Sequence, residues 1–265
     1  FCASMSSSAG AGTPAGEAQA KAALEKSPRH GQWVDVAVPG SPTPLRCYIV
    51  YPERSDKAPI VIVIHEIFGV TDWIRAVTDE LAADGFIAIA PDMLSGQGKD
   101  GRGTESFASR DDVVKAIRAL KSDDVMTNLD AVREYAIKLP AANGKSACIG
   151  FCWGGANSFA YAAHQPDLNA AVVYYGTSPD AAALSKIQAP ILGLYGSDDA
   201  RVNATVAPAD AEMKKLGKSY QHHTYDGAGH GFLRAQDGRD GANKRAAEQA
   251  WPATIEFLTA STKPG

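Results

Sequence analysis

The feature that most constrains the fold is an unbroken β-branched run, IVIVI, at residues 60–64. Alternating apolar and polar residues are typical of a strand with one wet face, whereas a continuous apolar run predicts a strand buried on both faces. Such strands occur in parallel sheets that helices cover on both sides. The run therefore predicts the central strand of an α/β protein.

Strand and helix patterns alternate along the rest of the chain. Before the run, residues 33–38 and 45–51 alternate around the turn residues Pro39 to Pro42, which predicts an antiparallel hairpin. After it, strands are predicted at residues 86–90, 146–150, 170–174, 191–195 and 220–225. Helices are predicted at residues 72–83, 110–120, 125–139, 153–164, 208–216 and 243–260. This alternation predicts a mainly parallel sheet with helices on both faces.

Composition excludes several classes of protein. The 265 residues are 45% hydrophobic, and 26 Lys+Arg against 30 Asp+Glu leave a formal charge of −4 without a basic stripe. A largely disordered chain and a nucleic-acid partner are therefore not expected. No apolar run approaches the roughly 20 residues that cross a bilayer, so no membrane span is expected. Four cysteines without paired CxxC motifs argue against a disulfide scaffold and against structural zinc.

The N-terminal segment differs from the rest in composition. Residues 1–16 are rich in Ser, Ala and Gly, and residues 17–26 predict a short helix. We expect a poorly ordered tail over residues 1–27 and a single α/β domain over residues 28–265. The small residues of the tail are typical of what remains of a secretory leader. We therefore expect an exported, periplasmic protein, with a cytoplasmic protein as the alternative.

Gly150-Phe151-Cys152-Trp153-Gly154 lies between a predicted strand and a predicted helix. The form Gly-x-nucleophile-x-Gly is typical of a strained turn in which glycines leave room for an exposed nucleophile. At a helix N-terminus, free N–H groups and the helix dipole favour a thiolate, and the N–H of Trp153 supplies half of an oxyanion hole. Cys152 is therefore predicted as a nucleophile, and a small buried core residue is the alternative.

A nucleophilic thiol needs a base that a carboxylate orients, and in α/β-hydrolases the acid and then the histidine follow the nucleophile. Asp198 and Asp199 follow the predicted strand 191–195, and His230 follows the strand 220–225. Open parallel sheets bind their ligands at these carboxyl ends. His230 is the predicted base, and Asp198 and Asp199 compete for the orienting role.

Glu66 directly follows the buried run, in His65-Glu66-Ile67-Phe68-Gly69. An acid at this place costs stability unless it is paired or used, so Glu66 is a functional candidate, with a solvent-facing loop carboxylate as the alternative. His65-Glu66 lacks the second histidine of a zinc protease. His222 and His223 are adjacent and point to opposite faces of a strand, so we expect no metal site.

Together these motifs resemble the dienelactone hydrolase family, whose α/β-hydrolase fold carries a cysteine nucleophile. The match runs from about Val34 to Leu258, with four motifs in the family's order: Glu66-Ile67-Phe68-Gly69, Gly150-x-Cys152-x-Gly154-Gly155, Gly196-x-x-Asp199-x-x-Val202 and Gly229-His230-x-Phe232. The resemblance implies a Cys152–His230–Asp199 triad and so favours Asp199 over Asp198. It also implies that Glu66 accepts the thiol proton and that the N–H of Ile67 is the second oxyanion donor beside Trp153.

The resemblance extends to the substrate. Arg234 and Arg110 occupy the places of two arginines that hold the substrate carboxylate in family members, and Phe68, Tyr175 and Phe232 are expected to line the pocket. The implied enzyme is a carboxylic-ester hydrolase of the carboxymethylenebutenolidase type. It would cleave a carboxylate-bearing, dienelactone-like ester or lactone from aromatic degradation, through an acyl-enzyme and without a cofactor.

Three alternatives remain. A broad carboxylesterase would cleave neutral esters and leave the two arginines idle. A non-catalytic protein would use the hydrolase scaffold for binding alone. A redox protein would pair Cys148 with Cys152, which are four residues apart across the turn. Whether the protein is a monomer or a dimer is left open.

Overall fold

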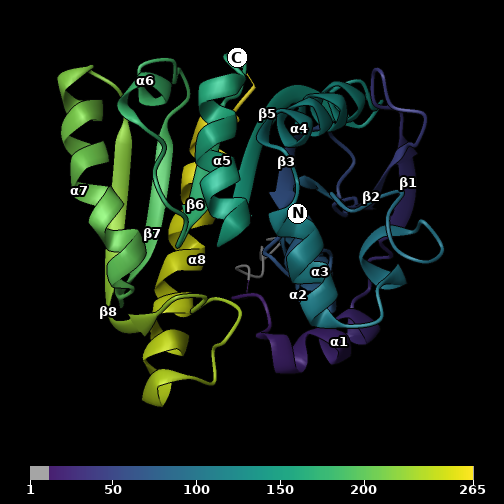
Figure 1. Ribbon diagram of the computed structural model, residues 1–265, viewed down its shortest axis with the longest axis horizontal. Coiled ribbons are helices and arrows are strands. Elements are labelled where there is room, and N and C mark those ends of the chain that lie inside the picture. Colours follow the sequence, from purple (N-terminus) through teal and green to yellow (C-terminus); the bar gives the residue numbers. More distant parts are fainter. Residues whose placement is uncertain (1–11, 265) are drawn as a thin grey trace, which may run out of the picture.

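An eight-stranded sheet forms the centre of the computed structural model, which describes residues 12–264 (Figure 1). The strands are β1 (Gln32–Val36), β2 (Leu45–Val50), β3 (Ala58–Ile64), β4 (Ile87–Pro91), β5 (Ala142–Phe151), β6 (Ala170–Tyr174), β7 (Ile191–Asp198) and β8 (Tyr220–Gly229). Their order across the sheet is β1-β2-β4-β3-β5-β6-β7-β8. The pairs β1–β2 and β2–β4 are antiparallel and the others are parallel. The α/β class, the mainly parallel sheet and the N-terminal hairpin are thereby confirmed.

Helices cover both faces of this sheet. They are α1 (Glu17–Lys26), α2 (Asp72–Ala83), α3 (Arg110–Arg118), α4 (Ser122–Ala136), α5 (Trp153–His164), α6 (Ala181–Leu184), α7 (Ala200–Lys215) and α8 (Ala242–Ser261). One apolar cluster joins the sheet to α4, α5 and α7, and a second joins it to α2 and α8. Strand β3 supplies Ile60, Ile62 and Ile64 to the first cluster and Val61 and Val63 to the second. The unbroken apolar run is thus buried on both faces, as its composition predicts.

Helix α7 is longer than the sequence pattern predicts. A proline is tolerated in the first turn of a helix, so Pro208 favours a helix start at that residue. The structure instead places Pro208 inside α7, which begins at Ala200. Because proline has no N–H, the carbonyl of Ala204 one turn earlier loses its usual helical donor. The early start puts the helix N-terminus directly after Asp199.

Hydrogen bonds to the buried side chain of Asp92 hold the glycine-rich segment between β4 and α3 in place. Asp92, at 1% exposure, accepts hydrogen bonds from the N–H groups of Leu94 (3.0 Å) and Thr104 (2.8 Å) and from the Thr104 hydroxyl (2.9 Å). Thr104 belongs to a short 3₁₀ turn, Gly103–Ser106. These bonds fix the path of the chain as it leads into α3.

Helix α1 packs against α2, and its bounds are those that the sequence predicts (Figure 1). Ala20 is fully buried in this contact. Directly after the helix, the Ser27 hydroxyl donates to Asp79 on α2 (2.9 Å), and Arg29 forms an ion pair with the same carboxylate (3.0 Å). Residues 1–11 of the expected tail lie outside the described residues, and the division into tail and domain stays a prediction.

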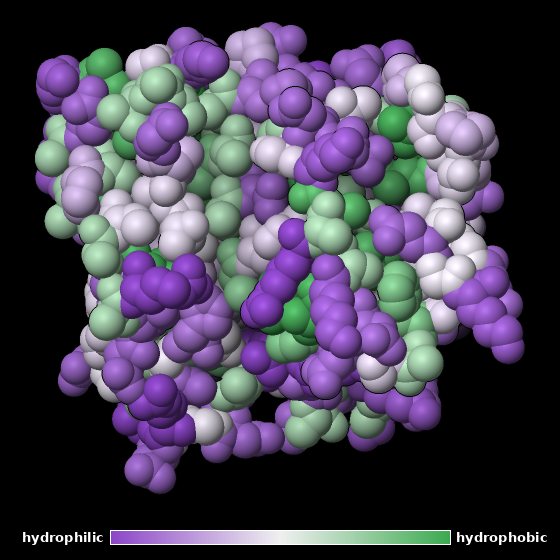
Figure 2. Space-filling model, in the orientation of Figure 1, coloured by the Kyte–Doolittle hydropathy of each residue, from purple (hydrophilic) through white to green (hydrophobic). Residues whose placement is uncertain are grey.

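The surface is mixed in character. Figure 2 shows polar and apolar side chains interspersed over the face in view. Among the large hydrophobic side chains of residues 12–264, Leu216 is the exposed one, at 37%. Within the same residues, no helix combines the length and the apolar character that crossing a membrane requires.

Candidate active site

The candidate catalytic residues meet where parallel strands end. Glu66 follows β3, Cys152 follows β5, Asp199 follows β7 and His230 follows β8. The chain passes from β3 to β4 on one side and then returns to β5 on the other side of β3. In open α/β sheets such a reversal opens a crevice at the carboxyl ends of the strands. The sheet topology therefore brings together residues that lie up to 164 positions apart, from Glu66 to His230.

Cys152 lies in the strained turn that its flanking glycines predict. Its φ of 57° and ψ of −115° are unusual for a residue with a side chain, and its N–H donates to the Tyr174 carbonyl (3.1 Å). A Cβ on Gly150 would lie 1.9 Å from the Gly154 oxygen, and one on Gly154 would lie 2.1 Å from the Ile64 oxygen. Only glycines allow α5 to begin this close to the sheet, with the thiol at its N-terminus.

His230 is bound to Asp199. The Nδ1 of the imidazole lies 2.6 Å from Oδ2 of Asp199, a carboxylate at 8% exposure. Asp198 points elsewhere and forms an exposed ion pair with Arg239. The ring of Tyr175 packs against the imidazole, with the two centroids 5.2 Å apart. Of the two competing acids, Asp199 is the one that can orient the histidine.

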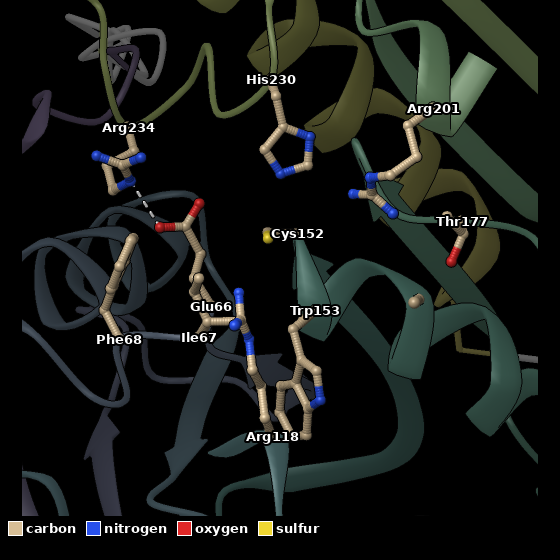
Figure 3. A pocket seen from close by; sticks show the side chains of 11 residues that line it. Glu66, Ile67, Phe68, Arg118, Cys152, Trp153, Thr177, Arg201, His230 and Arg234 are labelled. Atoms are coloured by element: carbon tan, nitrogen blue, oxygen red, sulfur yellow. Dashed lines mark ion pairs between the residues drawn. The ribbon is translucent and has the colours of Figure 1, made fainter. Parts of the chain in front are cut away.

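Cys152 is surrounded by groups that control its ionisation (Figure 3). Burial raises the pKa of its thiol to about 11, and the Glu66 carboxylate contributes to the rise. The backbone N–H of Trp153 opposes this rise. Because Trp153 is the first residue of α5, its N–H has no acceptor within the helix. The thiol is therefore protonated at neutral pH while the pocket holds no substrate.

Glu66 is a buried carboxyl group beside an arginine. At 2% exposure, burial raises its pKa to about 7, while the Arg234 guanidinium, whose Nε lies 2.7 Å from Oε2, opposes the rise. The preceding His65 is fully buried, and burial lowers its pKa. Its Nε2 accepts from the Met93 N–H (3.3 Å), so Nδ1 carries the proton and donates to the Glu66 carbonyl (2.7 Å). A neutral imidazole thus holds the backbone of Glu66.

The Cys152 thiol lies in the wall of a pocket of about 460 Å³. Its volume is suited to a small molecule. Its wall consists of Glu66, Ile67, Phe68, Arg118, Cys152, Trp153, Ala156, Thr177, Arg201, His230 and Arg234. The residues predicted as nucleophile, base, buried acid and oxyanion donors are all in this wall.

Three residues predicted to bind substrate are not in this wall. Tyr175 and Phe232 are both fully buried, with their rings 5.3 Å apart, and the prediction that they line the pocket is wrong. Hydrophobicity alone does not distinguish an aromatic ring that lines a pocket from one that fills the core behind it. Arg110 lies over the ring of Phe68 and pairs with Glu17.

Two arginines of the wall, Arg118 and Arg201, were not predicted from the sequence. Arg201 lies two residues after Asp199, in the first turn of α7. Its nearness in sequence to the predicted acid could have indicated that it lies at the pocket. Arg118 ends α3, and no motif points to it. Within residues 12–264, no group of three or more His, Cys, Asp or Glu side chains has an arrangement that could hold a metal ion.

The sequence of this chain matches a known protein family over most of its length. The family model described as "Dienelactone hydrolase family" matches residues 45–262. The chain belongs to the dienelactone hydrolase family. It is thereby a hydrolase of the dienelactone hydrolase type, and the match includes all four motifs on which the resemblance was based.

Curated relatives agree with this family assignment. A Salmonella typhimurium protein named "Putative carboxymethylenebutenolidase" is 31% identical over 235 residues, which cover 84% of this chain and 85% of the relative. A protein of the same name from Escherichia coli K12 is also 31% identical and is covered to 84%.

Solved structures agree in fold. One titled "Putative Dienelactone Hydrolase", from Klebsiella pneumoniae, superposes with a TM-score of 0.76 at 28% identity and covers 87% of this chain and 98% of its own. A dienelactone hydrolase-like promiscuous phosphotriesterase from metagenomic libraries superposes with a TM-score of 0.71 at 24% identity, over 89% of this chain and 99% of its own. At that identity the second likeness concerns the fold.

Proposed function

We propose that this protein hydrolyses an ester or lactone by covalent catalysis at Cys152. The observation that carries the proposal is the meeting of a thiol on a strained turn, a histidine bound to a buried aspartate, and a buried glutamate, all around one pocket. Each of these groups has a separate task in acyl transfer.

The first step forms a thioester. Once substrate occupies the pocket, the ionised Glu66 takes the proton of the Cys152 thiol, and the sulfur attacks the carbonyl carbon of the substrate. The pair of electrons moves to the carbonyl oxygen, which the N–H groups of Ile67 and Trp153 stabilise. The tetrahedral intermediate then collapses, and the leaving alkoxide takes up the proton that Glu66 received from the thiol. The pKa of about 7 allows Glu66 both to accept and to release a proton near neutral pH.

The second step frees the enzyme. His230 removes a proton from water, and the resulting hydroxide attacks the thioester carbon. The Cys152 sulfur departs and takes up the proton that His230 removed from water, and the acid product is released. Asp199, at 2.6 Å, holds the imidazole in one tautomer and stabilises its charged form. Both a carboxylate-bearing lactone and a neutral ester fit this chemistry, because the reacting groups are the same.

Rates of variants test the proposal. We expect Cys152→Ala to lower kcat/KM at least about a thousandfold for p-nitrophenyl acetate and for a dienelactone, because no other group supplies the attacking sulfur. The control is Cys148→Ala: this buried thiol lies 3.2 Å from the Ser158 hydroxyl, belongs to β5 and is absent from the pocket wall. Equal rates for wild type and Cys152→Ala on both substrates would contradict the proposal.

Two of the alternatives are tested by the same samples. A wild-type protein without turnover of either substrate would support the binding-protein alternative. A Cys148–Cys152 disulfide, found by peptide mapping of native protein, would support the redox alternative.

A further inference from the structure

Two arginines lie against one aromatic ring at one end of the pocket. The guanidinium carbon of Arg110 lies 3.6 Å from the ring centroid of Phe68, and that of Arg234 lies 5.2 Å from it. Phe68 and Arg234 belong to the pocket wall. Guanidinium groups held in this way present N–H donors in a fixed fork, which suits a carboxylate. We call Arg110, Arg234 and Phe68 the arginine cradle.

A carboxylate of the chain itself already fills the arginine cradle. Oε1 of Glu17 lies 3.0 Å from Nη2 of Arg110, and its Oε2 lies 2.7 Å from Nη1 of Arg234. One carboxylate thus bridges the two guanidinium groups with both of its oxygens. Glu17 is the first residue of α1 and lies 217 positions from Arg234.

Glu17 is anchored on both sides. Its own N–H donates to the Arg234 carbonyl (2.8 Å), and just before it the Pro14 carbonyl accepts from the Gln236 amide (2.7 Å). On its other side Ala20 is fully buried against α2. A carboxylate held by backbone and helix packing is a fixed part of the site, which favours a role in specificity over a role as a switch.

Arg234 already faces two carboxyl groups of the chain. Besides Glu17, it faces the buried carboxyl group of Glu66 at 2.7 Å. A substrate carboxylate at the arginine cradle would meet two acidic side chains and would have to displace one of them. Repulsion between like charges is strongest beside Arg234, whose side chain is 19% exposed, and is weaker beside Arg110, whose side chain is 51% exposed.

We infer that Glu17 determines which substrates the site accepts according to their charge. The Glu17 carboxylate occupies the place that a substrate carboxylate would take on Arg110 and Arg234. The end of the pocket formed by Phe68 therefore takes an uncharged group. The inference rests on the proposed hydrolysis at Cys152, and it selects the neutral ester or lactone over the carboxylate-bearing one.

The test compares two esters of matched length, p-nitrophenyl butyrate and mono-p-nitrophenyl succinate, which differ by a terminal carboxylate. In Glu17→Gln we expect the ratio of kcat/KM for the succinate to that for the butyrate to rise about tenfold, because the vacated guanidinium groups can bind the substrate. The gain should shrink in high salt. It should be lost in the double variant Glu17→Gln/Arg110→Gln.

Two further variants control for charge and for folding. Glu25→Gln removes the same charge from an exposed position of α1 and should leave the ratio within about twofold of wild type. Ala20→Asp puts a charge into the buried contact with α2 and should release α1, so the ratio should rise as it does in Glu17→Gln.

The inference is overturned if the ratio stays constant or falls in Glu17→Gln. A fall would mean that Glu17 holds the two arginines ready for a substrate carboxylate. Cys152→Ala, assayed alongside, distinguishes a failure of the proposed function from a failure of the role inferred for Glu17. Turnover that survives in this variant contradicts the proposed function, whereas Cys152-dependent turnover with an unmoved ratio contradicts the role of Glu17 alone.

Discussion

At the scale of single residues, the charge of Glu66 contributes to the protonation of Cys152. Burial raises the pKa of both, to about 11 for the thiol and to about 7 for the carboxyl group, and the charge of Glu66 contributes to the rise at Cys152. Above pH 7 Glu66 is ionised and keeps the proton on sulfur. The resting thiol is thereby kept from reaction with passing electrophiles.

Glu66→Gln should change thiol reactivity and turnover in opposite directions. Without the Glu66 charge the pKa of Cys152 falls, so at pH 8 to 9 the thiolate fraction rises, and alkylation by iodoacetamide should be about three to ten times faster. The variant has no carboxylate to accept the thiol proton, so kcat/KM should fall about a hundredfold. Asp198→Asn, which removes an exposed charge near the same strand ends, is the control. An alkylation rate that matches wild type across pH would show that the two groups are not coupled.

Motifs predicted which polar side chains line the pocket better than hydrophobicity predicted which aromatic rings line it. Cys152, His230 and Glu66 were predicted from motifs whose expected chemistry requires these residue types. The residues alone did not indicate which of Asp198 and Asp199 orients the histidine, because the predicted strand ends before both of them. The structure distinguishes them by their partners, Arg239 and His230.

At the scale of elements, the junction of β5 and α5 determines where the thiol and the Trp153 N–H lie. Gly154 is in contact with the end of β3, so the position of the α5 N-terminus depends on the absence of a side chain there. Gly154→Ala should push the first turn of α5 away from the sheet. We expect a loss of about 2 kcal/mol in the free energy of unfolding and about a hundredfold in kcat/KM.

A second glycine distinguishes a loss of stability from a displaced helix. Gly217 has a φ of 65°, and no atom lies within 4 Å of an added Cβ. Gly217→Ala should cost about 1 kcal/mol of unfolding free energy through backbone strain and leave kcat/KM near that of wild type. If Gly154→Ala retained wild-type turnover, the close contact of α5 with the sheet would not be needed for catalysis.

Elements with clear end signals were predicted with their observed bounds. Helix α2 begins after Thr71, whose hydroxyl accepts from the Ile74 N–H, and its predicted range of 72–83 matches the structure. Helix α7 was predicted too short because Pro208 indicates a start, while packing of Val202 and Val206 in the core overrides that local preference.

At the scale of the whole molecule, the sheet order assembles the site and the N-terminal helix completes it. Hydrophobic periodicity predicts strands but not which strands are neighbours, so the meeting of Glu66 with His230 was expected from the family resemblance and from the general rule for strand ends. The contact of Glu17 with Arg234 had no sequence signal. Helix α1 has weak amphipathic character and follows a segment of small residues.

The most direct test of the account is the mass of the protein during turnover. In His230→Ala, acylation by p-nitrophenyl acetate should proceed because Glu66 accepts the thiol proton, and deacylation should stall because water lacks its base. Intact-mass spectrometry of the quenched reaction should then show one acetyl group, and peptide mapping should place it on Cys152. Release of p-nitrophenol with no adduct, or an adduct on another residue, would contradict covalent catalysis by Cys152.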